Sequence, residues 1–139
     1  MVDREVVEKK LQELRGYVTE LEQLKKFSFE EIVSSLSRTW SIEHGLQIAI
    51  QIVIDIGNHI LASIRENEID EYVDIIDKLG EKNVIPLSFA KKIRDMAGFR
   101  NILVHEYTRV DLKQVYEILQ ERLGDFLEFI RHIKNYLKT

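Results

Sequence analysis

The chain has 139 residues, of which 45% are hydrophobic and 32% are charged, enough to build and cover one core. It has no cysteine, which excludes a disulfide framework and a thiolate metal site, and one proline and six glycines favour long helices over short strands. The net charge of −4 excludes a domain that holds nucleic acid by overall attraction, because such domains are usually basic.

We therefore expect one domain over residues 1–139. The amino terminus is charged and amphipathic and does not resemble a signal peptide. No apolar run approaches the roughly 18 residues of a membrane span. These features predict a cytoplasmic protein with no membrane contact.

The first predicted helix covers residues 3–26, where Gly16 costs about 1 kcal/mol relative to alanine. Its apolar residues recur at helical spacing: Leu11, Leu14, Val18, Leu21 and Leu24. Ser28 and Glu31 then have the spacing of a capping box, which begins a second helix.

The second segment is ambiguous, because apolar residues alternate over residues 46–56 as they do in a strand. A helical stripe fits equally well: Ile42, Leu46, Ala49, Val53, Ile56, Ile60 and Ile64. No turn signal brackets the alternating run. A helix that is apolar on more than one face explains both patterns. We predict a helix over residues 29–65, central in a bundle or facing a partner subunit.

The remaining elements are also predicted to be helical. Tyr72, Ile75, Ile76 and Leu79 indicate a short third helix that Gly80 stops. Pro86 suits the first turn of a fourth helix, whose buried stripe is Phe89, Ile93, Met96 and Ala97. Asp111 and Gln114 indicate another capping box, followed by one last helix from Leu112 to Leu137. The fold class is all-α: an antiparallel up-and-down bundle of four to five helices.

Residues 100–107 hold the chemically suggestive side chains, in the order Arg100, His105, Tyr107. Arginine grips phosphate with a rigid fork of donors, and histidine moves a proton near neutral pH. Together they can cleave a phosphodiester without a metal. An acidic chain needs a local basic cluster for RNA, and the basic residues around the motif are Lys91, Lys92, Arg94 and Arg109.

Helix geometry separates two of these side chains. At about 100° per residue, Tyr107 shares a face with Arg100, but His105 lies about 140° away. Either the helix ends near Leu103 or Val104 and leaves His105 in a turn, or a second subunit completes the site. Asn101, four residues before His105, is spaced to orient the imidazole.

Each residue of the motif also has an ordinary structural explanation. Arg100 can form a surface ion pair with Asp95 or Glu106, His105 can bond to backbone at a helix end, and Tyr107 can be a core aromatic.

Outside the motif, Asp55 lies in an apolar helix where an unpaired charge is costly, so it pairs across a dimer or faces a cleft. His44, His59 and His132 lack metal-ligand spacing, and we expect neither metal nor cofactor.

Residues 96–107 resemble the signature of HEPN-domain proteins, with its Arg-x4-His motif, and the tyrosine two residues after the histidine is similar to the HepT-like (DUF86) branch. The second predicted helix also resembles that branch at Arg38, Glu43, Gln47 and residues 55–60. The similarity covers nearly the whole chain.

The resemblance implies a dimeric helical bundle in which two motifs meet in a cleft, and a ribonuclease toxin that needs no metal. It also implies an MntA-type nucleotidyltransferase antitoxin that silences the toxin by adding AMP to the motif tyrosine. Carried over to this chain, Arg100 and His105 are catalytic, Tyr107 is the AMPylation site, and Asn101 and Asp55 support the site.

We therefore expect a homodimeric endoribonuclease that cleaves RNA by attack of the 2′-hydroxyl and leaves a 2′,3′-cyclic phosphate. Two alternatives remain open. One is a non-catalytic HEPN module that binds a nucleotide or its nucleotidyltransferase partner, and the other is a purely structural dimerising bundle.

Overall fold

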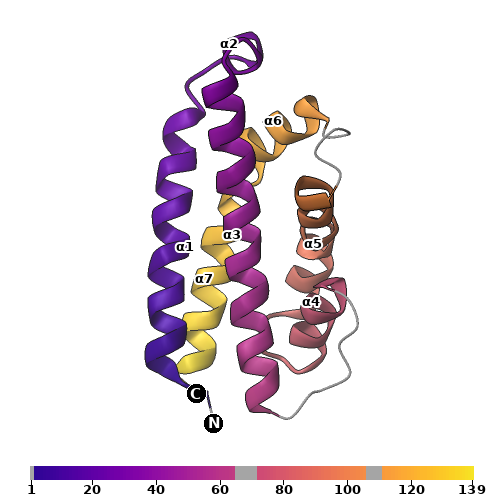
Figure 1. Ribbon diagram of the computed structural model, residues 1–139. Coiled ribbons are helices and arrows are strands. Elements are labelled where there is room, and N and C mark those ends of the chain that lie inside the picture. Colours follow the sequence, from indigo (N-terminus) through magenta and orange to yellow (C-terminus); the bar gives the residue numbers. More distant parts are fainter. Residues whose placement is uncertain (1, 65–71, 106–110) are drawn as a thin grey trace.

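The computed structural model describes residues 2–64, 72–105 and 111–139, and the regular structure in these ranges is helical (Figure 1). The segments are α1 (Arg4–Leu24), α2 (Phe29–Val33), α3 (Leu36–Ser63), α4 (Tyr72–Glu81), α5 (Leu87–His105), α6 (Leu112–Glu121) and α7 (Leu123–Leu137). The all-α class is confirmed. The predicted four to five helices become seven segments over the described ranges, because two predicted helices are each split.

The first split divides the helix predicted over residues 29–65 into α2 and α3. The Ser28–Glu31 capping box is present, as predicted, and begins α2. A second cap then begins α3, where the Ser35 hydroxyl accepts from the Arg38 amide at 3.2 Å. The Thr39 hydroxyl donates to the Ile32 carbonyl at 3.0 Å and ties the two segments together. The prediction of one unbroken helix was therefore wrong at this end, although α3 itself is helical and not a strand.

The second split falls at Arg122, inside the helix predicted from Leu112 to Leu137. Arg122 has φ −115° and ψ 1°, which ends α6 and begins α7. Asp111 caps α6 by accepting from the Lys113 amide, so this predicted helix start is confirmed, but the cap bond falls on Lys113 and not on the Gln114 of the predicted capping box. At this break the Arg122 side chain bonds to the nearby Asp125 and also to residues of α5 that are distant in the sequence.

The turn between α4 and α5 also differs from the prediction. Gly80 does not stop α4, which continues to Glu81, and Asn83 supplies the left-handed backbone of the turn at φ 58°. Gly80 instead permits close packing, because a Cβ at this position would lie 2.7 Å from the Cβ of Ala90. Pro86 directly precedes α5 and its carbonyl accepts from the Ala90 amide at 3.0 Å, in agreement with its predicted place at the helix start.

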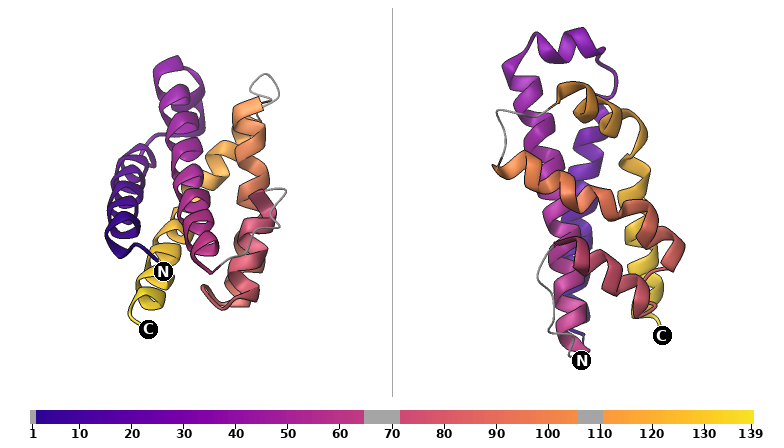
Figure 2. Two further views of the ribbon diagram at one scale, coloured as in Figure 1. Left: turned by 60° about the horizontal axis from the view of Figure 1, so that its bottom comes forward. Right: turned by 90° about the vertical axis from the view of Figure 1, so that its right-hand side faces the viewer.

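The long helices alternate in direction, so the up-and-down arrangement is confirmed (Figure 1). α3 lies at the centre, between α1 on one side and α4 and α5 on the other. α5 crosses α3 obliquely, and both chain termini lie at the same end of the bundle (Figure 2). This crossing brings the last turns of α5 beside the middle of α3.

The central position of α3 explains its mixed sequence pattern. Most isoleucines of the strand-like run are buried, and Ile48 is half-buried; the buried ones are Ile50, Ile52, Ile54 and Ile56. They occupy several faces of one helix, which is packed on more than one side. By length and composition α3 is apolar enough to cross a membrane, but 61% of its most apolar window is buried inside the bundle. Its composition is therefore that of a core helix.

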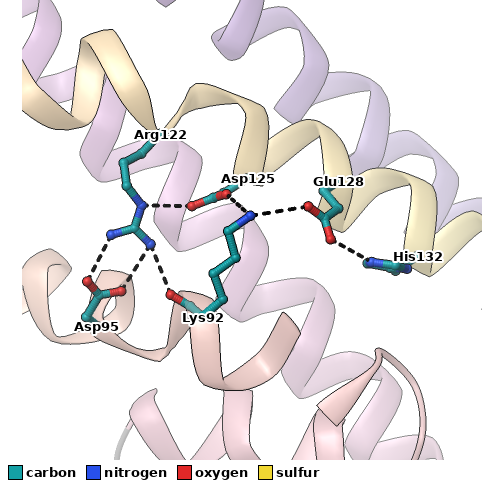
Figure 3. A network of polar contacts seen from close by, with 6 residues as sticks. All are labelled: Lys92, Asp95, Arg122, Asp125, Glu128 and His132. Atoms are coloured by element: carbon teal, nitrogen blue, oxygen red, sulfur yellow. Dashed lines mark hydrogen bonds and ion pairs between the residues drawn. The ribbon is translucent and has the colours of Figure 1, made fainter. Parts of the chain in front are cut away.

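A polar network holds α5 against α6 and α7 (Figure 3). Asp125, only 7% exposed, lies 3.3 Å from Lys92 Nζ and accepts from Arg122 Nε at 2.8 Å. The other Arg122 nitrogens donate to Asp95 and to the Lys92 carbonyl. The hydrogen bond with Asp125 raises the pKa of the Lys92 ammonium, and the hydrogen bond with Asp95 raises the pKa of the Arg122 guanidinium. The network thereby fixes how α5 sits in the bundle.

Two of the basic residues that precede the motif form ion pairs with carboxylates. Lys92 is engaged in this network, and Arg94 pairs with Asp77 at 3.1 Å. Neighbouring carboxylates therefore offset part of the positive charge of these two residues. Lys91 is exposed, and Arg109 lies outside the described residues.

Candidate functional site

α5 presents the first part of the motif as a continuous helix that ends at His105. Of the two arrangements considered, a helix end near Leu103 or Val104 is therefore excluded, and completion of the site by a second subunit remains. Positions 100 and 105 remain about 140° apart around the helix axis. The His105 side chain and all of Glu106, Tyr107 and Arg109 lie outside the described residues.

Arg100 joins a hydrogen-bonded chain that runs from α5 to α3. Its Nε donates to Gln51 Oε1 at 2.8 Å, and Gln51 Nε2 donates to Asp55 Oδ1 at 2.8 Å. On the other side, Arg100 Nη1 donates to Asn101 Oδ1 at 3.3 Å. We refer to Asp55, Gln51, Arg100 and Asn101 as the arginine chain. It gives the half-buried guanidinium a defined place at the crossing of the two helices (Figure 2).

Three of the predicted site residues thus meet in the arginine chain. Asp55 is half-buried and faces this cluster, so its charge is accommodated by the Gln51 amide. Asn101 is exposed and contacts Arg100, while its predicted role in orienting the His105 imidazole stays a prediction. The considered ion pair of Arg100 with Asp95 does not form, because Asp95 binds Arg122.

Two further residues of the second predicted helix lie apart from the arginine chain. Arg38 donates to the Glu31 carbonyl at 3.1 Å and stacks over the Phe27 ring at 4.0 Å. Glu43 is half-buried on α3, and burial raises the pKa of its carboxyl. Neither residue takes part in the hydrogen bonds that hold Arg100.

Gln51 is the site residue that the sequence reasoning missed. One local signal was available, because Gln51 and Asp55 are four residues apart and so share a face of α3. The bond from Gln51 to Arg100 spans 49 residues. Such a contact depends on how α5 crosses α3, and it cannot be predicted from the spacing of residues in the sequence.

The groove beside the motif is unsuited to phosphate. It has a volume of about 520 Å³ between α5 and α6. Asp95 and Arg122 line it as an ion pair, and Glu117 and Glu121 line it as well. These carboxylates repel a polyanion. In the part of the chain that the structure describes, no group of three or more metal-ligating side chains is placed to hold an ion.

The face of α3 that carries Gln51 also bears exposed apolar side chains. Leu36 is 67% exposed and Trp40 is 63% exposed, one turn apart. Trp40 and Gln51 lie about 20° apart around the helix and roughly 16 Å apart along it. An apolar surface of this kind, next to a polar site, is typical of a protein interface.

Comparison with known proteins identifies related sequences and structures. The model of the family described as Ribonuclease HepT-like matches residues 8–133. The tRNA nuclease HepT of Aphanizomenon flos-aquae is 29% identical over 134 residues, covering 96% of this chain and 91% of the relative. The mRNA nuclease HepT of Shewanella oneidensis is 33% identical over 94 residues, which cover 68% of this chain and 71% of the relative.

A similar solved structure is that of a tri-AMPylated Shewanella oneidensis HEPN toxin in complex with MNT antitoxin. The TM-score is 0.85 at 26% sequence identity, and the match covers 97% of this chain and 99% of the other.

Proposed function

The chain belongs to the HepT-like ribonuclease family, and from this premise we propose that it is a toxin endoribonuclease that cuts RNA without a metal ion. Nuclease relatives that match most of the chain support the reaction class. The observation that carries the assignment of the site is the arginine chain, which fixes a cation on α5 five residues before His105.

In the proposed reaction the RNA supplies its own nucleophile. The 2′-oxygen attacks the adjacent phosphorus, and the bond from phosphorus to the 5′-oxygen breaks. A base removes the 2′-hydroxyl proton, and an acid protonates the leaving 5′-oxygen, for which His105 has the suitable side chain. Arg100 stabilises the charge that develops on the phosphate oxygens. The products are a 2′,3′-cyclic phosphate and a 5′-hydroxyl.

We further propose that the site is completed by a second copy of the chain. Two considerations support this. Positions 100 and 105 face different directions on an unbroken α5, and one imidazole cannot serve as acid and base in the same step. A homodimer brings two histidines to one cleft. The exposed Leu36 and Trp40, on the face of α3 that carries Gln51, are suited to such a contact.

The partner in our proposal is a nucleotidyltransferase antitoxin that adds AMP to Tyr107. Support comes from the similar HEPN toxin, which is AMPylated and bound to an MNT antitoxin. AMP on Tyr107 would place a bulky anion two residues from His105, where it would exclude RNA by occupancy and charge. A toxin of this kind acts on RNA in the cytoplasm.

The direct test uses protein free of its partner, with RNA in a chelating buffer. We expect cut RNA that ends in a 2′,3′-cyclic phosphate. A product with a 3′-hydroxyl and a 5′-phosphate would contradict the mechanism, and RNA that is bound but not cut would favour the non-catalytic module.

The shared cleft is tested with a purified heterodimer of one wild-type and one His105→Ala subunit. If both histidines act on one phosphate, this heterodimer retains little activity. Activity of about half the wild-type value would show two independent sites and contradict the shared cleft.

A further inference from the structure

The Gln51 side chain has only one orientation that satisfies both of its neighbours. Its Oε1 accepts from Arg100 Nε, and its Nε2 donates to Asp55 Oδ1, each at 2.8 Å. A carboxylate offers only acceptors and a guanidinium offers only donors. A flipped amide would therefore place donor against donor and acceptor against acceptor. Asp55 thus fixes which end of the amide meets Arg100.

The bonds from Arg100 to Gln51 and Asn101 are both accepted by amide oxygens, which bring no net charge. Asp55 lies beyond Gln51 in the arginine chain, where its charge polarises the Gln51 amide and strengthens the bond to Arg100.

We infer that Gln51 is a positioning residue for RNA cleavage: it aims the Arg100 guanidinium at the scissile phosphate from α3, in an orientation set by Asp55. This inference rests on the proposed ribonuclease function and deepens it. Because positioning acts on the transition state, loss of the Gln51 amide affects kcat more than KM.

The first experiment measures kcat and KM of the full-length chain, free of its partner, on one RNA substrate. Gln51→Met keeps the side-chain length but removes both hydrogen bonds, and we expect kcat to fall about 10- to 100-fold with little change in KM. Gln47→Met is the matched control, since Gln47 is a half-buried glutamine one turn earlier on α3. An equal fall in both variants would overturn the specific role of Gln51.

The second experiment asks whether Gln51 acts through Arg100. Arg100→Lys keeps the charge but has no Nε–H in that position, so the Gln51 amide loses its partner. In this background Gln51→Met should change kcat less than about twofold. The same fold-loss in both backgrounds would show that Gln51 acts independently of Arg100 and would overturn the inference.

A second substitution of Gln51 distinguishes a loss of positioning from a folding defect. Gln51→Glu keeps the shape of the side chain and an acceptor for Arg100, but adds a carboxylate beside Asp55. Its kcat relative to wild type should rise as the pH falls from 8 to 5, because protonation removes the added charge. A ratio that stays flat with pH would count against the inference.

The failures are distinguishable. If the wild-type chain, free of its partner, does not cut RNA, the proposed function fails. If Arg100→Ala cuts RNA like wild type, the proposed role of Arg100 fails. If Arg100→Ala is inactive while Gln51→Met is unaffected, only the inference about Gln51 fails.

Discussion

Arg100 Nε and Gln51 Oε1 lie 2.8 Å apart, and this hydrogen bond joins α5 to α3 across 49 residues of sequence. The arginine of the motif is therefore held from outside the motif. Its position depends on how α5 crosses α3 (Figure 2), and the network around Asp125 holds the same helix, α5, against α6 and α7 (Figure 3). Site geometry and bundle packing are linked through one helix.

Trp40 tests the proposed dimer surface. Trp40→Glu places a charge on a side chain that is 63% exposed, so the subunit should keep its thermal stability. A dimer formed through this face of α3 should dissociate and lose ribonuclease activity together. Light scattering and RNA cleavage measure the two effects. Leu127→Glu, at an exposed leucine on α7, should remain dimeric. A dimeric, active Trp40→Glu variant would exclude this face as the interface.

Tyr107 tests the proposed silencing. After incubation with the nucleotidyltransferase partner and ATP, the intact mass of the wild-type chain should increase in AMP-sized steps, and RNA cleavage should decrease in parallel. Tyr107→Phe should show neither change. Tyr17→Phe, on α1, is the control and should be modified like wild type. AMP additions that persist in Tyr107→Phe would place the modification elsewhere.

Asp125 tests the network that seats α5. Asp125→Ala removes a 7% exposed carboxylate that contacts both Lys92 and Arg122. We expect the free energy of unfolding to fall by about 1–3 kcal/mol, because Lys92 and Arg122 lose a buried, charged hydrogen-bond partner. Asp95→Ala removes a 66% exposed partner of the same arginine and should cost less than about 1 kcal/mol. Urea denaturation compares them, and equal losses would contradict this account.

Two helical glycines give a matched pair for packing. A Cβ at Gly57 would lie 2.7 Å from Ile75 Cγ2 and 3.0 Å from Leu79 Cδ1, whereas a Cβ at Gly16 meets nothing within 4 Å. Gly16→Ala should therefore stabilise the fold by up to about 1 kcal/mol. Gly57→Ala should destabilise it, because overpacking costs about 1–3 kcal/mol and exceeds the helix gain. A stabilised Gly57→Ala variant in urea denaturation would mean that α3 and α4 pack less tightly than described.

Much of the fold was predictable from sequence because its apolar residues recur with helical spacing. The stripes on α1 and α5 and the Ser28–Glu31 capping box were identified in this way, and α3 was correctly interpreted as a helix apolar on several faces. The break at Arg122 was missed; there the side chain bonds to Asp95 and to the Lys92 carbonyl, which are distant in the sequence. Local patterns do not report contacts of this range.

The candidate site was predictable only in part, for the same reason. Arg100, Asn101 and Asp55 were selected by residue type and resemblance, and the structure brings them together. Gln51, which connects Asp55 to Arg100, was missed because glutamine on a helix surface is common and its partner is 49 residues away. One of the two arrangements considered, a helix end before His105, is excluded because α5 includes that residue.

The most direct test of the central claim is RNA cleavage by the purified, partner-free protein in a chelating buffer, compared with Arg100→Ala and His105→Ala. Thermal unfolding first establishes that both variants are folded. Our account predicts that the wild-type protein cuts RNA and that each substitution lowers the rate by at least about 100-fold. Cleavage that survives both substitutions would contradict the assignment of Arg100 and His105 as the catalytic residues.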